Sequence, residues 1–233
     1  MGIKYTKEAF LEGQLLLINK PFVWTSFQVV NKIRWAIRKE FDIKKIKVGH
    51  AGTLDPLATG LMLICTGRMT KQIGQFMGMN KTYTGTFRLG ATTPSYDLET
   101  TVSASKPTEH INAKMLAEVC AGFLGNIQQK PPLHSAIKKD GKRLYTLARA
   151  GKTTDIPSRE VLITGFELTD LNIPNVDFSV SCSKGTYIRT LAHDFGQKLG
   201  CGAHLTSLKR TAIGNYQLAE ALTLNGFLNN LEK

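Results

Sequence analysis

The apolar residues of this sequence recur with two periods, and the first period is typical of helices. In residues 25–41 apolar side chains return every three or four positions, which places them on one face of a helix that Thr25 or Ser26 can cap. This predicted apolar stripe consists of Phe27, Val30, Ile33 and Ile37. We expect the cations that lie mostly off the stripe to be solvated, with contact to phosphate as the alternative; they are Lys32, Arg34, Arg38 and Lys39.

Other segments show the same helical spacing. Residues 108–125 predict a helix that ends at Gly125. Its expected core residues are Ile111, Met115 and Val119. Further helices are expected over 68–79, over 218–233, and in a segment that follows a turn at Lys184–Gly185 and ends at Gly200.

The second period is the alternation, or the short apolar run, that is typical of strands. Residues 13–21 carry an apolar run that stops at Pro21, where the chain loses a backbone donor. Strands are also expected over 61–67, 81–90 and 176–182, with short strand-like pieces in 204–216.

Helical and strand-like segments alternate irregularly, without an internal repeat or a Ser/Pro-rich linker. We therefore expect one α+β domain over residues 1–233, with a mixed, mainly antiparallel sheet flanked by helices. The longest apolar run, Leu61–Cys65, is too short to cross a bilayer. Because the sequence also begins without a cleavable signal pattern, we expect a cytoplasmic protein with no membrane partner.

Charge and cysteine content narrow the classes of function. The chain has 30 Lys and Arg against 18 Asp and Glu, a formal charge of +12, which implies an anionic partner such as nucleic acid. The four cysteines are widely separated and form no CxxC pair, so we expect buried, reduced thiols and no metal site. They are Cys65, Cys120, Cys182 and Cys201.

Residues 130–152, which we call the basic segment, carry much of this charge. Its piece "KKDGKR" predicts a hairpin turn with Asp140–Gly141 at the tip, followed by a helix. Such a hairpin could clamp a nucleic-acid backbone, and an ordinary exposed hairpin is the equal alternative. Its cations are Lys130, Lys138, Lys139, Lys142, Arg143, Arg149 and Lys152.

One acidic residue stands out in the stretch "GHAGTLDPLATGLMLICTG", because Asp55 is the only acidic residue between Asp42 and Asp97. It could cap a helix, since Pro56 follows it, but Gly60 interrupts that helix after one turn. No second acid lies nearby in sequence for a metal or a glycosidase pair, and the phosphate-binding glycine spacings are absent. A carboxylate nucleophile, or a carboxylate held by an arginine, remains.

The same stretch resembles the catalytic motif of the TruB family of pseudouridine synthases. Three further pieces resemble that family's motifs and occur in the family's order: "LLLINKP", "KTYTGTFRLGATTPSYD" and "CSKGTYIRTLAHDFGQKLGCGAHLTSLKR". The resemblance implies the pseudouridine synthase fold and an enzyme that isomerises a uridine in the T loop of tRNA, at position 55. It implies that the base is flipped out, and that no cofactor or metal is needed.

The resemblance also assigns roles to residues. Asp55 matches the family's nucleophile, Arg189 the arginine that holds it, and Tyr83 the tyrosine that packs on the uracil. Tyr187 and Leu208 match pocket-lining residues. The remaining matches are His50 beside the flipped nucleotides, Asp97 as an acid that meets substrate or positions neighbours, and Lys20 with Pro21 as support beneath the site.

The basic segment falls where this family inserts a loop that grips the T arm. The sequence departs from the family around Asp97, where "TTPSYD" is less acidic, and it stops at Lys233, so we expect no C-terminal PUA domain. We also expect a monomer without a protein partner. The alternatives are a non-catalytic RNA-binding protein, which has no use for such a carboxylate, and a base-excision enzyme, which would release uracil.

Overall fold

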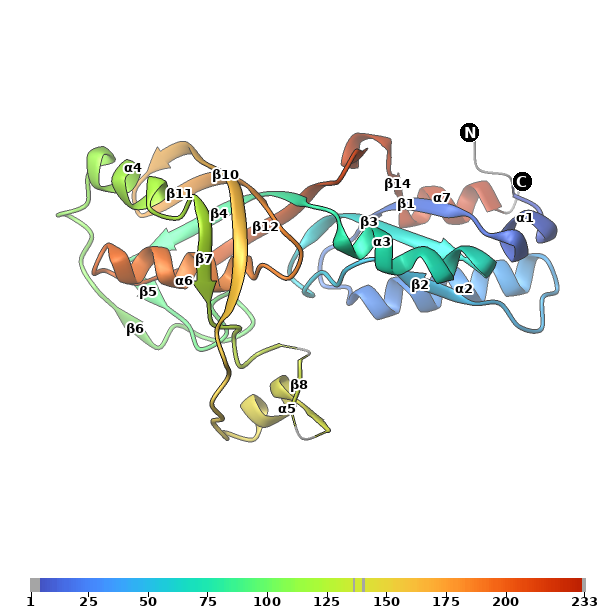
Figure 1. Ribbon diagram of the computed structural model, residues 1–233, viewed down its shortest axis with the longest axis horizontal. Coiled ribbons are helices and arrows are strands. Elements are labelled where there is room, and N and C mark those ends of the chain that lie inside the picture. Colours follow the sequence, from blue (N-terminus) through green and yellow to red (C-terminus); the bar gives the residue numbers. More distant parts are fainter. Residues whose placement is uncertain (1–4, 136, 140, 232–233) are drawn as a thin grey trace. The chain divides into compact units, whose positions relative to one another are not determined.

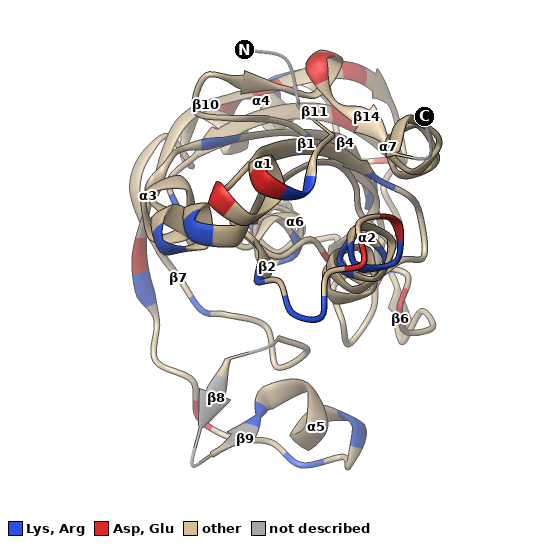
Figure 2. Ribbon diagram, turned by 90° about the vertical axis from the view of Figure 1, so that its right-hand side faces the viewer, with Lys and Arg blue, Asp and Glu red and all other residues tan. Residues whose placement is uncertain are grey.

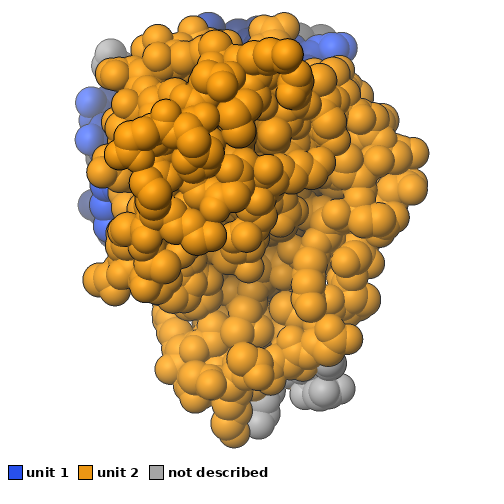
Figure 3. Space-filling model, turned by 90° about the vertical axis from the view of Figure 1, so that its left-hand side faces the viewer, with its two compact units in different colours: residues 1–83, 208–233 blue, residues 84–207 orange. Residues whose placement is uncertain are grey.

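The fold is organised around hydrogen-bonded strands (Figure 1). The computed structural model describes residues 5–135, 137–139 and 141–231. The chain forms two compact units, coloured separately in Figure 3. Unit 1 comprises Met1–Tyr83 and Leu208–Lys233, and unit 2 comprises Thr84–Ser207. The chain passes between the units within strands β4 (Lys81–Leu89) and β12 (Ala203–Ile213).

The strands of unit 1 centre on β3, which is apolar along nearly its whole length and buried. It pairs antiparallel with β1 and β2, and parallel with β12, while β14 adds to β1 in parallel. These strands are β1 (Leu15–Lys20), β2 (Val48–His50), β3 (Thr59–Thr66), β13 (Tyr216–Gln217) and β14 (Leu222–Thr223). The helices are α1 (Lys7–Glu12), α2 (Ser26–Glu40), η1 (Gly67–Gln72), α3 (Ile73–Gly78), η2 (Leu218–Glu220) and α7 (Leu224–Leu231).

Unit 2 continues with antiparallel strands in the order β4-β11-β10-β7. Stacked and edge-on phenylalanines fill its core, with Phe87 and Phe178 at a centroid distance of 4.1 Å. Its further strands are β5 (Ala91–Thr92), β6 (Ala104–Ser105), β7 (Gly125–Gln129), β8 (Lys138–Lys139), β9 (Lys142–Arg143), β10 (Arg159–Asn172) and β11 (Asn175–Cys182). Its helices are α4 (Ala113–Ala121), α5 (Leu144–Arg149) and α6 (Ile188–Lys198).

The α+β class and the mainly antiparallel sheet are confirmed, and so are the strands at 15–20, 59–66, 81–89 and 175–182. The predicted stripe of α2 is wrong at Phe27, which is 64% exposed. The helix begins with the buried Ser26, and one residue turns a helix by about 100°, so position 27 points away from the core. Val29 and Ala36 take the remaining inward positions.

Three other expectations need correction. Helix α4 is shorter than predicted, and it buries Leu116 and Cys120 while Met115 and Val119 are only half-buried. Strand β12 is one continuous strand and not several pieces. The C-terminal segment forms η2, β14 and α7 where one helix was expected, because residues 222–223 pair with β1. The long strand β10 was not predicted.

The four cysteines are all buried and free, as expected. Within the described part of the chain no helix is long and apolar enough to span a membrane.

Candidate active site

Asp55 lies in the loop between β2 and β3, which we call the Asp55 loop (residues 51–58), and it is half-buried. The backbone N–H of Ala58 donates to the Asp55 carbonyl at 3.1 Å, closing a turn in which Pro56 takes the second position. Strand β3 follows at Thr59, so Asp55 does not cap a helix. The loop therefore presents a carboxylate that is neither in bulk solvent nor in a sealed core.

The first residue of α2 holds this loop from one side. The buried Ser26 Oγ donates to the Leu54 carbonyl at 2.9 Å and accepts from the Leu54 N–H at 2.8 Å. Thr25 caps the same helix, and with Gln28 it completes a capping box. The two neighbouring hydroxyls thus have different tasks, because Thr25 satisfies the helix end and Ser26 fixes the residue before Asp55.

Lys20, at the end of β1, holds the loop from beneath. Its side chain is fully buried, and its Nζ donates to the carbonyls of Pro21 at 3.0 Å, Trp24 at 2.5 Å and Pro56 at 3.1 Å. The pKa of Lys20 is lowered to about 8, mainly because the side chain is buried. The charge of Asp55 acts in the opposite direction and raises this pKa, while the charge of Arg210 contributes to lowering it. Lys20 therefore binds the backbone of the residue after Asp55 and interacts with the Asp55 charge.

Arg210 is a second buried cation of this site, and the sequence reasoning missed it. Its Nε donates to the Leu61 carbonyl at 2.7 Å and its Nη2 to the Gly52 carbonyl at 3.1 Å. The backbone of Arg210 also passes so close to Gly60 that a Cβ there would lie 2.3 Å from the Arg210 carbonyl oxygen. Gly60, whose φ is +104°, is thus required by this close approach. Arg210 links Gly52, near the start of the Asp55 loop, to Leu61 in β3, which follows the loop.

His50 ends β2, five residues before Asp55 in the chain. It is half-buried, and its buried Nδ1 has no hydrogen-bond partner among the described residues. Burial, and then the charge of Arg210, lower the pKa of His50, which keeps the ring neutral near pH 7. Tyr83 in β4 is 8% exposed, and Leu208 in β12 is half-buried. Both residues belong to unit 1.

Arg189 is placed in unit 2, in the first turn of α6, and its side chain is 3% exposed. Its Nε lies 3.6 Å from Oδ2 of the buried Asp97, while Nη1 donates to the Ser95 carbonyl at 3.2 Å and Nη2 to the His134 carbonyl at 2.9 Å. Arg189 is therefore a buried residue and not a surface arginine of α6. Asp97 therefore forms a buried ion pair with Arg189, and the two carbonyls bind the rest of the guanidinium.

Tyr187 immediately precedes α6 and is fixed through its backbone. The buried Gln129 side chain accepts from the Tyr187 N–H at 2.7 Å and donates to the Tyr187 carbonyl at 3.0 Å. The ring is half-buried, and the guanidinium of Arg159 lies 4.8 Å from its centroid. Gln129 is another positioning residue that the sequence reasoning missed, because its partner lies 58 residues away.

The basic segment forms the predicted hairpin, β8 with β9, followed directly by α5. Asp140, the expected tip residue, lies outside the described residues. Arg143 and Arg149 both lie within 6 Å of the Tyr145 ring centroid, at 5.8 and 5.5 Å, and Arg149 pairs with Glu99 at 3.1 Å. Figure 2 shows blue Lys and Arg positions at the two ends of α5.

Among the described residues no group of three or more His, Cys, Asp or Glu is arranged to hold a metal ion. Of the eight residues singled out in the sequence, unit 1 contains Lys20, His50, Asp55, Tyr83 and Leu208, and unit 2 contains Asp97, Tyr187 and Arg189. Within unit 1 Lys20 and Arg210 converge on the Asp55 loop, and within unit 2 Asp97 converges on Arg189.

Comparisons with known proteins agree with these features. The family model described as TruB family pseudouridylate synthase (N terminal domain) matches residues 38–188. The model described as tRNA pseudouridylate synthase B C-terminal domain matches residues 189–233.

Curated relatives and solved structures extend the likeness. A tRNA pseudouridine synthase B of Flavobacterium johnsoniae is 55% identical over 97% of this chain and 100% of its own length. Its counterpart in Phocaeicola vulgatus is 51% identical over 94% and 93%. A chain in the crystal structure of a Cbf5-Nop10-Gar1 complex superimposes with a TM-score of 0.71 at 26% identity. That likeness covers 94% of this chain and 54% of the other, so this chain spans about half its length.

Proposed function

The chain belongs to the TruB family of pseudouridylate synthases, and from this premise we propose that it modifies the T loop of tRNA at position 55 through the carboxylate of Asp55. It is a tRNA pseudouridine synthase, and it isomerises uridine in tRNA to pseudouridine. In this reaction the bond between N1 and C1′ breaks, the uracil rotates, and a bond between C5 and C1′ forms. The proton leaves C5 and N1 gains one, so the composition is unchanged.

Asp55 is the nucleophile of this proposal, and it attacks either C6 of the uracil or C1′ of the ribose. A carboxylate attacks only when it is ionised, so the site must favour the charged form. The cations Lys20 and Arg210 are both fixed to backbone carbonyls at the Asp55 loop, and the charge of Asp55 acts on Lys20. This half-buried carboxylate, on a loop held by two buried cations, is the single observation that carries the proposal.

Arg189 is proposed as the guanidinium that aims the carboxylate during reaction. Its own orientation is over-determined by Asp97 and by two carbonyl oxygens, which leaves little rotational freedom to lose when substrate binds.

Tyr83 is proposed to pack on the flipped uracil, because aromatic faces stabilise unstacked bases. Tyr187 and Leu208 line the same pocket in this proposal, and His50 contacts the neighbouring nucleotides as a neutral ring. The pre-fixed backbone of Tyr187 supports its part in a shaped pocket.

The basic segment is proposed as an insertion of one catalytic domain that grips the phosphates of the T arm. We further propose that the protein acts as a cytoplasmic monomer, without a protein partner, a metal or a cofactor. The formal charge of +12 supports binding of a polyanion without help from a second protein.

The experiment that tests the proposed function is incubation of the protein with tRNA or with a T-arm stem-loop, followed by nucleoside analysis. The expected result is one pseudouridine per RNA at position 55 and no free uracil. Release of uracil would identify a base-excision enzyme, and RNA binding without either product would identify a binding protein; each would overturn the proposal.

A further inference from the structure

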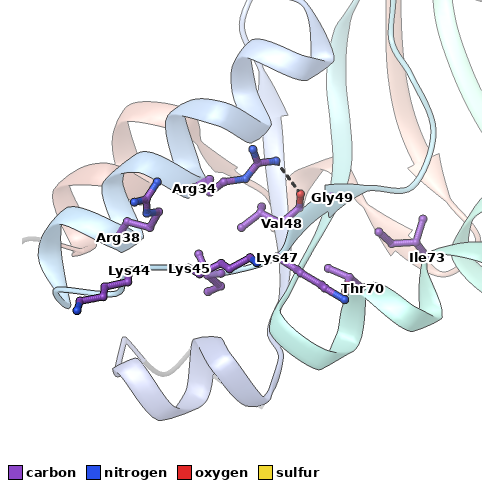
Figure 4. A pocket seen from close by; sticks show the side chains of 10 residues that line it. Arg34, Arg38, Lys44, Lys45, Lys47, Val48, Gly49, Thr70 and Ile73 are labelled. Atoms are coloured by element: carbon purple, nitrogen blue, oxygen red, sulfur yellow. Dashed lines mark hydrogen bonds between the residues drawn. The ribbon is translucent and has the colours of Figure 1, made fainter.

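A cavity of about 410 Å³ lies in unit 1 between α2, the segment before β2, and the turn of η1 and α3 (Figure 4). Five of its ten lining side chains are cationic and none is acidic. We call it the α2 pocket, and its cations are Arg34, Arg38, Lys44, Lys45 and Lys47. None of the residues identified above as site residues lines it.

The two arginines of the α2 pocket are fixed by neutral acceptors. Arg34 donates to the Val48 carbonyl at 3.1 Å, the bond drawn in Figure 4, and to the Asn31 side chain at 3.2 Å. The Nε of Arg38 donates to the Ile43 carbonyl at 3.2 Å. These bonds orient the guanidinium groups without neutralising their charge.

The three lysines are exposed, and they line the pocket together with the two arginines. Their backbone is held in place, because the Gly67 N–H donates to the Lys47 carbonyl at 2.9 Å and β2 begins at Val48. Within the described part of the chain none of the five cations forms an ion pair. Five like charges around one cavity repel one another, and an anion placed among them relieves that repulsion.

We propose that the α2 pocket binds phosphodiester groups of the substrate RNA, as a second electrostatic contact separate from the basic segment. The inference rests on the proposed function, because it takes tRNA as the polyanion. Oriented guanidinium groups and flexible ammonium groups are the donors that suit phosphate oxygens. The pocket is continuous in the chain with the Asp55 loop, since Gly49 lines it and His50 follows, so bound phosphate would fix β2 as well.

The test compares the salt dependence of RNA binding in two variants that lose the same charge. The pocket variant is Lys44→Gln/Lys45→Gln/Lys47→Gln, whose side chains make no hydrogen bond among those described. The control variant is Lys7→Gln/Lys106→Gln/Lys114→Gln, which removes three exposed lysines from other places. Kd for tRNA and for the T-arm stem-loop is measured from 50 to 300 mM salt.

Each lost phosphate contact reduces the slope of log Kd against log salt by about 0.7 to 0.9, so we expect the pocket variant to lose about 2 from its slope with tRNA. Its Kd at 100 mM salt should rise about 10-fold or more, while the control changes less than half as much. If the slope decreases with both RNAs, the phosphates that the pocket binds belong to the T arm. If it decreases with tRNA alone, they belong to another arm of the tRNA. Equal slopes for the pocket and control variants overturn the inference and leave the pocket to a non-RNA anion.

A second measurement uses the wild-type protein and so does not depend on the folding of any variant. Lysines are labelled with an amine-reactive reagent, with and without tRNA, and quantified by mass spectrometry. We expect tRNA to reduce labelling of Lys44, Lys45 and Lys47 several-fold and to leave Lys7 unchanged; unreduced labelling of the three overturns the inference. Pseudouridine is assayed in the same preparation. If pseudouridine forms but neither test shows RNA binding at the α2 pocket, only the inference about the pocket is overturned. If no pseudouridine forms, the proposed function is overturned.

Discussion

At the scale of single residues, the site rests on charges that are fixed by backbone carbonyls. Lys20 and Arg210 are almost completely buried, and each donates hydrogen bonds to carbonyl oxygens in or next to the Asp55 loop. Both therefore keep their positions when the charge on Asp55 changes during a reaction, which is the arrangement expected of a preorganised electrostatic site.

Substitution Arg189→Lys tests whether the planar guanidinium is needed. A lysine retains the charge but cannot reach Asp97 and the Ser95 and His134 carbonyls together, since the ammonium has no fork. We expect kcat/KM for pseudouridine formation to fall about 100-fold or more. A variant with the wild-type rate would show that Arg189 serves the fold only.

Lys20 predicts an alkaline limit on activity. Its pKa of about 8 means that it loses a proton, and with it one hydrogen-bond donor and the charge facing Asp55, as pH rises through 8. We expect kcat/KM to decline above pH 8, and Lys20→Met to be slower but to lack this decline. A wild-type profile that stays flat to pH 9.5 would contradict this role.

The titration of Lys20 should affect stability and activity in opposite directions as the pH rises. The folded pKa is depressed from 10.5, so between pH 8 and 10.5 the unfolded chain binds more protons at this position. The contribution of Lys20 to the free energy of unfolding therefore rises with pH across that window. Denaturant unfolding at pH 8 and pH 10 separates this contribution from the loss of activity.

At the scale of elements, the sequence predicted those segments whose pattern is local. The run at 61–65 and the alternation at 81–89 appear as β3 and β4, and Thr25 caps α2 as its residue type predicts. The failures depend on contacts distant in sequence. Residues 222–223 form β14 only because β1 lies beside them, and Phe27 is exposed because Ser26 is bonded to Leu54. The motif likewise made Asp55 and Arg189 candidates, but it gave no sign of Arg210, whose side chain bonds to residues 149 and 158 positions away.

The first turn of α2 offers a matched pair of substitutions. Thr25→Ala removes a helix cap and Ser26→Ala removes both hydrogen bonds to Leu54, and each should lower the free energy of unfolding by about 1 to 2 kcal/mol. Only Ser26→Ala loosens the residue next to Asp55, so we expect it alone to lower kcat, by about 10-fold. Denaturant unfolding and single-turnover assays on both variants test this, and equal effects on kcat would refute the role given to Ser26.

At the scale of the whole molecule, the charge of +12 makes tRNA binding a largely electrostatic event. If the basic segment and the α2 pocket together make about six phosphate contacts, as we propose, Kd should weaken about 10³-fold between 50 and 200 mM salt. Fluorescence titrations of labelled tRNA give this slope. A response of less than about 10-fold would mean that neither region binds phosphate in the way proposed.

The measurement that tests the account most directly is the activity of Asp55→Asn beside its tRNA affinity in the same preparation. Asparagine keeps the size of the side chain and removes its charge and nucleophilicity, so the Asp55 loop should keep its shape. The account predicts no detectable pseudouridine, with a Kd for tRNA within a few-fold of the wild-type value. Pseudouridine formation at the wild-type rate would contradict it, because the reaction would then proceed without the carboxylate that the Asp55 loop presents.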